Sequence, residues 1–183
     1  MRIHALLRLA FGLSLLTLGS PAQAQDAKAP TDEEIIAKVS TVAPAHVVKD
    51  ATIVVMEKDG TRRVVREGTG EFTCIQMAWR PGMCLDRNAQ AWVQALQSHQ
   101  TPPVKIGIVY ELEGGNPAGG SNTDPYAKGP QPDNHWIRTG PSVAIVGIST
   151  MTDGHPRDPD AAPTKPWVMY PGTPYEHLMI PVK

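Results

Sequence analysis

FTCIQMAWRPGMCLD, residues 72–86, contains both cysteines of the chain and decides what kind of fold the remainder can form. Nine residues separate Cys74 from Cys84, and Arg80-Pro81-Gly82 between them is a turn signal. Thioredoxin-like redox chemistry needs Cys-x-x-Cys, and zinc sites of the finger type need a second pair of ligands at similar spacing. Neither pattern is present, so the spacing favours a structural disulfide that closes the turn.

The first 24 residues have the features of a secretory signal peptide. Basic residues flank the start of a short apolar core at residues 9–18, and Ala22-Gln23-Ala24 places small side chains before an expected cut at Gln25. The apolar core is shorter than the roughly 20 residues that a membrane-spanning helix needs. We therefore expect a soluble periplasmic or secreted protein without membrane insertion, in an oxidising compartment that joins the two cysteines.

Cleavage at this point would leave residues 25–183, a length typical of a single domain. This part has 15 Lys and Arg against 18 Asp and Glu, and therefore a formal charge of −3. Nucleic acids and anionic membranes select clustered positive charge, so neither is expected as a partner. The cluster formed by Arg62, Arg63 and Arg66 is expected on the solvated face of a strand.

Local patterns predict two helices and about six strands. Thr31 caps a short helix that Pro44 ends, and Asp86 caps a longer amphipathic helix that stops before Pro102. The first two strands form an antiparallel hairpin through Lys58-Asp59-Gly60. The strands are expected at residues 52–57, 61–67, 71–76, 106–112, 142–148 and 178–182, with a further short one at 167–170.

These elements predict an α+β fold: a mostly antiparallel sheet of about six strands, two helices packed on one side, and one disulfide. A stretch of 22 residues at 113–134 connects two of the strands, and nine of its residues are Gly or Pro. A loop of this length inside a compact domain is expected to be either functional or mobile.

Three segments of the chain resemble uncharacterised exported bacterial proteins that have no assigned activity. The segments are SNTDPYA at residues 121–127, GPSVAIVG at 140–147 and YPGTPYEHLMIPV at 170–182. The resemblance implies one compact exported domain of bacterial origin. It implies no activity, cofactor or site residue.

The long loop and the residues that follow it hold the first candidate site. Asp124, Tyr126, Asp133, His135 and Trp136 could form the rim of a ligand pocket with a titratable imidazole and aromatic faces. The alternative is structural, because Asp and Asn commonly start turns and the two aromatic residues could pin the loop to the body. The turn-forming composition of the loop favours this second interpretation.

Two further clusters suggest metal binding, but neither has the required spacing. Residues 153–160 place three acids and His155 close together, without the alternating ligands and terminal Glu of a calcium loop. Six methionines and His177 could suit Cu(I), but no short Met or His-Met repeat concentrates them, and core packing is favoured. The sequence therefore predicts no metal site and no cofactor.

The chain lacks the motifs that common hydrolases use. Residues 140–144, Gly-Pro-Ser-Val-Ala, miss the closing glycine of a nucleophile elbow, and neither His-Glu-x-x-His nor a phosphate-binding loop occurs. We therefore expect a non-catalytic domain that binds a small molecule or a protein partner through the 113–134 loop. Scattered catalytic residues leave an alternative open: a periplasmic metal-binding protein or hydrolase that uses His135, His155 or His177.

Overall fold

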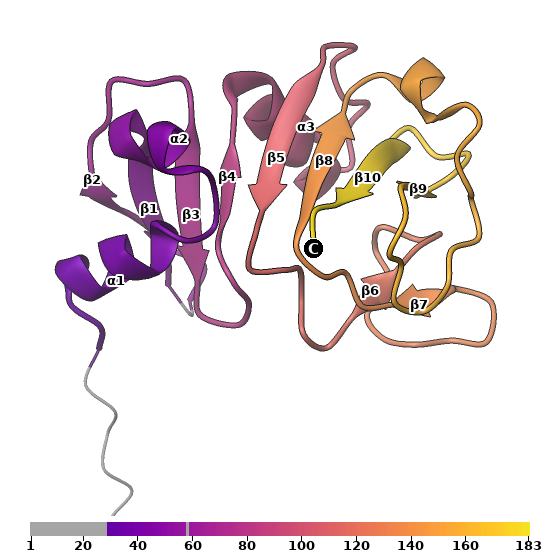
Figure 1. Cartoon of the computed structure of the whole chain (residues 1–183), viewed down its shortest axis with the longest axis horizontal. Coiled ribbons are helices and arrows are strands. Elements are labelled where there is room, and N and C mark those ends of the chain that lie inside the picture. The colour runs from indigo at the N-terminus through magenta and orange to yellow at the C-terminus, as the bar shows by residue number, and fades with distance from the viewer. Residues whose placement is uncertain (1–28, 58) are drawn as a thin grey trace, which may run out of the picture.

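The computed structural model describes residues 29–57 and 59–183, so the predicted signal peptide lies outside the described residues. These ranges form three α-helices, one short 3-10 helix and ten strands, most of them in one large sheet (Figure 1). The helices are α1 (Asp32–Val39), α2 (Ala45–Asp50), α3 (Arg87–Gln97) and the 3-10 helix η1 (Ser149–Thr152). The strands are β1 (Thr52–Met56), β2 (Arg62–Arg66), β3 (Thr73–Met77), β4 (Met83–Leu85), β5 (Gly107–Glu111), β6 (Gly120–Ser121), β7 (Trp136–Ile137), β8 (Ser142–Val146), β9 (Trp167–Met169) and β10 (His177–Pro181). None of the helices in the described ranges is both long enough and apolar enough to span a membrane.

The large sheet is mixed and has eight strands in the order β2-β1-β3-β4-β5-β8-β10-β9. Its neighbouring strands are antiparallel except for β1 and β3, which run parallel with Met56 opposite Met77 at their carboxyl ends. The predicted α+β class is confirmed, and the prediction of a mostly antiparallel sheet is roughly right, but the sheet has eight strands where about six were expected and contains one parallel pair. β6 and β7 form a separate two-stranded ladder.

The segment between β2 and β3 makes the parallel pair possible. Because β2 is the hairpin partner of β1 on its outer side, the chain must cross the amino end of β1 to reach the inner side. The Gly68 N–H donates to Thr52 Oγ1 at 3.1 Å, and the Gly70 N–H donates to Asp50 O at 2.7 Å. A Cβ on Gly68 would collide with the Ala51 backbone, so the crossing requires glycine at this position.

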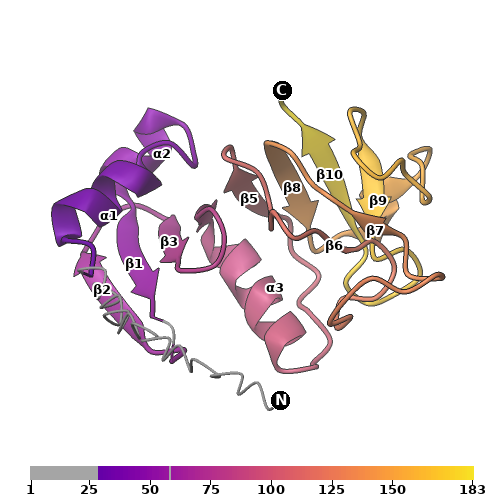
Figure 2. The same cartoon turned by 90° about the horizontal axis from the view of Figure 1, so that it is seen from below.

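The helices cover both faces of the sheet and not one face as predicted. Cys84 and Leu85 are neighbours in β4, so their side chains point to opposite faces. Cys84 belongs to a core that includes residues of α1 and α2, whereas Leu85 belongs to a second core that includes residues of α3. Figures 1 and 2 show α1 and α2 on one side of the sheet and α3 on the other.

The predicted starts of α1 and α3 are confirmed. Thr31 Oγ1 accepts from the Glu34 N–H at 3.3 Å, and the Glu34 carboxylate accepts from the Thr31 N–H at 2.8 Å, which forms a capping box. Asp86 Oδ1 caps α3 by accepting from the Ala89 N–H at 2.7 Å. Helix α2 was not predicted, because Pro44 is its N-cap residue and not the end of α1.

Arg66 does not lie on a solvated face as predicted. Its guanidinium is partly buried and donates to the carbonyl oxygens of Val48 and Ala51 at the end of α2. Carbonyl groups in the last turn of a helix lack partners within the helix, so this arginine satisfies them.

The disulfide joins Cys74 in β3 to Cys84 in β4, as the spacing predicted. The two residues are direct partners in the antiparallel ladder, and both are fully buried in the core beneath α1 and α2. The bridge therefore holds β4, a strand of only three residues, at the place where the two cores meet across the sheet.

Removal of the bridge in a Cys74→Ala/Cys84→Ala protein should lower the free energy of unfolding by about 2 to 3 kcal/mol, because the unfolded chain regains the freedom of the closed loop. Urea denaturation measures this loss. Reductant should bring the natural chain to a similar stability and should leave the double variant unchanged. The structural role of the bridge would be contradicted if the natural chain kept its full stability after reduction, with a thiol assay showing that both cysteines are free.

Candidate functional site

The loop that the sequence singled out is ordered by its own hydrogen bonds. Ser121 Oγ donates to Asn134 O at 2.7 Å and accepts from the Asp124 N–H at 2.8 Å. The Asn134 side chain in turn donates to Gly129 O at 2.9 Å. Strands β6 and β7 pair at the base of the loop. These contacts give the loop a defined shape despite its many Gly and Pro residues.

A hollow of about 450 Å³ opens in this loop and is called the loop hollow below. It is lined by residues from Thr123 to Asn134, and these include Asp124, Tyr126 and Asp133 from the predicted set. Lys128 also lines it, so charged groups of both signs face the space. This lining suits a small polar ligand more than an apolar one.

Tyr126 also attaches the loop to the body of the protein. Its hydroxyl lies 3.2 Å from Leu96 O and 2.8 Å from the Tyr175 hydroxyl, and its ring stacks on His99 with centroids 4.0 Å apart. Burial, followed by the hydrogen bond with Tyr175, raises the pKa of Tyr126 to about 12. The structural role that the sequence favoured for this tyrosine is therefore present.

His135 and Trp136 do not line the loop hollow. His135 Nδ1 lies 2.6 Å from Asp158 Oδ1, on the proline-rich segment that precedes β9. The Trp136 indole N–H donates to Ala118 O at 2.9 Å, and a Cβ on Gly119 would collide with this ring. The five predicted residues thus separate into three that line the loop hollow and two, His135 and Trp136, that contact other segments.

His177, named in the alternative hypothesis, is buried between aromatic rings. Its ring centroid lies 5.1 Å from that of Trp92 and 5.4 Å from that of Tyr170, and its Nδ1 donates to Tyr175 O at 2.8 Å. Burial lowers the pKa of His177 to about 4, so the imidazole is neutral near pH 7. Throughout residues 29–57 and 59–183, no group of three or more His, Cys, Asp or Glu side chains is placed to hold a metal ion.

Glu176, next to His177, forms an internal ion pair. Arg157 donates to both of its carboxylate oxygens, at 2.7 and 2.9 Å, and the Gly172 N–H and the Thr152 hydroxyl donate at 2.6 and 2.5 Å. Burial alone would raise the pKa of Glu176, but these hydrogen bonds lower it to about 2. The acidic segment at 153–160 thus supplies an arginine that fixes the loop before β10.

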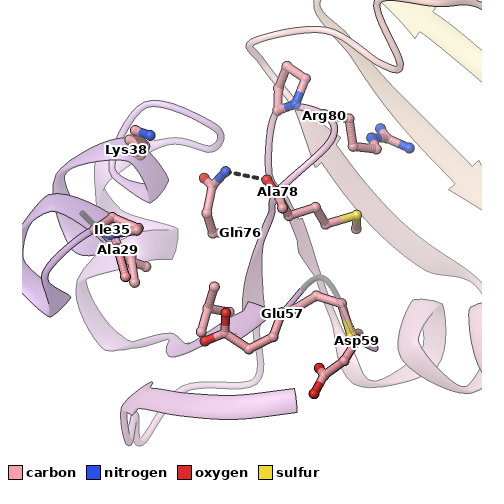
Figure 3. Close-up of a pocket in the computed structure, with 13 residues that line it drawn as sticks. Ala29, Ile35, Lys38, Glu57, Asp59, Gln76, Ala78 and Arg80 are labelled. Atoms are coloured by element: carbon pink, nitrogen blue, oxygen red, sulfur yellow. Dashed lines mark hydrogen bonds between the residues drawn. The ribbon is translucent and has the colours of Figure 1, made fainter. Parts of the chain in front are cut away.

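A larger hollow, of about 790 Å³, lies at the carboxyl ends of β1 and β3 and is called the sheet-end pocket below (Figure 3). Its lining comes from α1 and the two residues Ala29 and Pro30 before it, from the two strand ends and from the turns that follow them. The apolar part of the lining includes Ile35, Val55, Met56, Met77, Ala78 and Pro81.

The topology of the sheet explains why a pocket forms at this position. Beyond its carboxyl end β1 turns toward β2, whereas β3 turns toward β4 on the opposite side. In open α/β sheets, divergent connections of this kind leave a crevice at the carboxyl ends of parallel strands, where ligands bind. Here Glu57 and Asp59 come from the first turn, Ala78 and Arg80 from the second, and Lys38 from the covering helix.

The sheet-end pocket was not predicted from the sequence, because the parallel pairing of β1 with β3 was not predicted. The available signal was the pair of glycines at 68 and 70, which permits the crossing between β2 and β3. Comparison of the chain with known protein families, with curated proteins and with solved structures gave no match in any of the three. The geometry of the described residues is therefore the basis for the functional proposal.

The buried imidazole of His177 should make the protein less stable in mild acid. In the unfolded chain a histidine binds its proton near pH 6.5, whereas in the folded chain the pKa is about 4. Unfolding therefore takes up a proton as the pH falls through this window, and stability should drop by up to about 1.4 kcal/mol per pH unit. Urea denaturation at several values between pH 7 and pH 4 measures the slope.

In a His177→Phe protein the free energy of unfolding should no longer show the fall between pH 7 and pH 4 that His177 causes, even if the substitution changes the stability at pH 7. The matched control is His46→Gln, which changes an exposed histidine and should keep the slope of the natural chain. Equal slopes for the natural chain and His177→Phe would show that His177 is not held neutral by burial.

Proposed function

We propose that the chain is an exported, non-catalytic binding domain that holds a small apolar molecule in the sheet-end pocket. The observation that carries this proposal is the hollow of about 790 Å³ with mostly apolar walls at the divergent ends of β1 and β3. Ligand pockets in proteins typically have volumes of about 300 to 1,000 Å³ and an apolar lining with a few fixed polar groups.

The walls of the pocket combine rigid and adaptable side chains. Ile35 and Val55 belong to the core beneath α1, so their positions are fixed by packing. Met56 and Met77 are partners at the strand ends and also line the pocket, and thioether side chains adjust readily to the shape of a ligand. Their side chains belong to the face of the sheet opposite Val55, where Met77 packs against the second core. The Gln76 amide donates to Met77 O at 2.8 Å, which sets the direction of one polar group inside the pocket (Figure 3).

Two observations support the remaining parts of the proposal. The disulfide between Cys74 and Cys84 agrees with export, because such bonds persist mainly in oxidising compartments. A hydrolase or metal protein built on His135, His155 and His177 has less support, because His177 is buried and His135 pairs with Asp158.

The loop hollow is a second candidate binding site, as the sequence analysis proposed. It is favoured by one observation, which is that the long loop is hydrogen-bonded into a fixed hollow lined by Asp124 and Tyr126. Its ligand would be a small polar molecule or a charged segment of a partner protein.

An Ala78→Trp substitution should fill the sheet-end pocket and block ligand binding. Ala78 is exposed and lines the pocket, so a larger side chain can be placed there without disturbing the core. The probe is N-phenyl-1-naphthylamine, an uncharged apolar dye whose fluorescence rises in apolar surroundings. We expect the natural chain to bind the dye and Ala78→Trp to bind it at least about tenfold more weakly.

Two further tryptophan variants serve as controls in the same titration. Ala91→Trp alters an exposed position on α3, away from both hollows, and should bind the dye as the natural chain does. Gly129→Trp fills the loop hollow, where a side chain meets open space. If Gly129→Trp lost dye binding while Ala78→Trp kept it, the binding site would be the loop hollow and not the sheet-end pocket. If the natural chain did not bind the dye, the proposal of an apolar site would be contradicted.

A further inference from the structure

We propose that the sheet-end pocket selects an apolar ligand with an anionic head group, such as a fatty-acid carboxylate, and holds the head group at Lys38. This inference rests on the proposed function and extends it by assigning the charge and the orientation of the ligand. The inference is based on the charged side chains that line the pocket, some of which form ion pairs or hydrogen bonds within the protein while Lys38 forms no ion pair.

Among the lining residues that the structure describes, Lys38 and Arg80 carry positive charge, and Lys38 is the one that forms no ion pair. It lies in the last turn of α1, is exposed and lines the pocket. None of the ion pairs formed within the described part of the chain includes Lys38. Its ammonium group can therefore approach a ligand without first breaking an internal ion pair.

Arg80, the other cation of the pocket lining, is already engaged. Its Nη2 forms an ion pair with Glu111, which balances its charge, although its Nε is buried without a hydrogen-bond partner among the described residues; both side chains are largely buried. Figure 3 shows this guanidinium directed away from α1, whereas Lys38 lies on the α1 side. Arg80 therefore contributes to the wall of the pocket and leaves recognition of an anion to Lys38.

The acidic residues of the pocket also have partners. Glu57 accepts from Arg63 at 3.4 Å, and Asp59 accepts from the Thr61 N–H at 2.8 Å. Both acids belong to the turn after β1 and lie apart from Lys38 in Figure 3. Because like charges repel, they disfavour an anionic head group at this side and favour it at Lys38.

The resulting orientation places the apolar tail along the strand ends. With the head group at Lys38, the tail meets the apolar floor of the pocket, which consists of Val55 on the α1 face and of Met56 and Met77, whose side chains belong to the opposite face of the sheet. Contact with the apolar floor supplies most of the affinity, because it removes apolar surface from water. The exposed ion pair adds selectivity and a modest gain in affinity.

Competition between three ligands of equal tail length tests the inference. In this experiment octanoate, 1-octanol and octylammonium are each titrated into the natural chain with bound N-phenyl-1-naphthylamine, at pH 7 and low salt, and displacement of the dye is measured. We expect octanoate to bind about two- to fivefold more tightly than 1-octanol and octylammonium to bind least well, with the preference reduced in 0.5 M NaCl. Lys38→Met should abolish the preference without weakening 1-octanol, and Lys38→Glu should reverse it.

Lys49→Met is the matched control, because Lys49 is an exposed lysine of α2 that does not line the pocket. It should keep the preference for octanoate. Equal binding of octanoate and 1-octanol, tighter binding of octylammonium, or an unchanged preference in Lys38→Met would overturn the inference while leaving an apolar binding site in place. Failure of all three ligands and of the dye to bind would overturn the proposed function as well.

Discussion

The parallel pairing of β1 with β3 is the constraint on which the arrangement of the molecule depends. Because β2 folds back on the outer side of β1, the chain has to cross the amino end of β1 before β3 can begin, and Gly68 permits the close contact. The carboxyl ends of β1 and β3 then lie side by side while the chain leaves them in opposite directions. The sheet-end pocket, covered by α1, is a consequence of this topology and not of a sequence motif.

The parts of the fold that depend on neighbouring residues could be predicted from the sequence. The capping box at Thr31, the Asp86 cap and the hairpin of β1 and β2 are all local, and the Cys74–Cys84 disulfide spans one short turn. The mixed sheet and the helices on both faces depend on contacts between distant segments. Helix α2 and strand β4 are too short to give a clear sequence pattern. Pro44 was interpreted as the end of the first helix, whereas it is the N-cap residue of α2.

In the candidate sites, too, features within one segment could be predicted from the sequence, whereas contacts between distant segments could not. Asp124 and Tyr126 belong to one continuous loop, so sequence alone could place them together, and both line the loop hollow. His135 and Trp136 follow directly in the chain but contact Asp158 and Ala118, partners that the sequence could not identify. The lining of the sheet-end pocket is drawn from α1 and from two separate turns, so it could not be assembled before the parallel register was known.

A solution NMR titration of the isotopically labelled chain with octanoate would show whether the divergent ends of β1 and β3 form a ligand site. We expect the largest changes in amide chemical shift at Ile35, Lys38, Val55 and Met77, four residues that line the pocket. Changes centred on residues 123–134, or no localised changes at all, would contradict a ligand site at these strand ends.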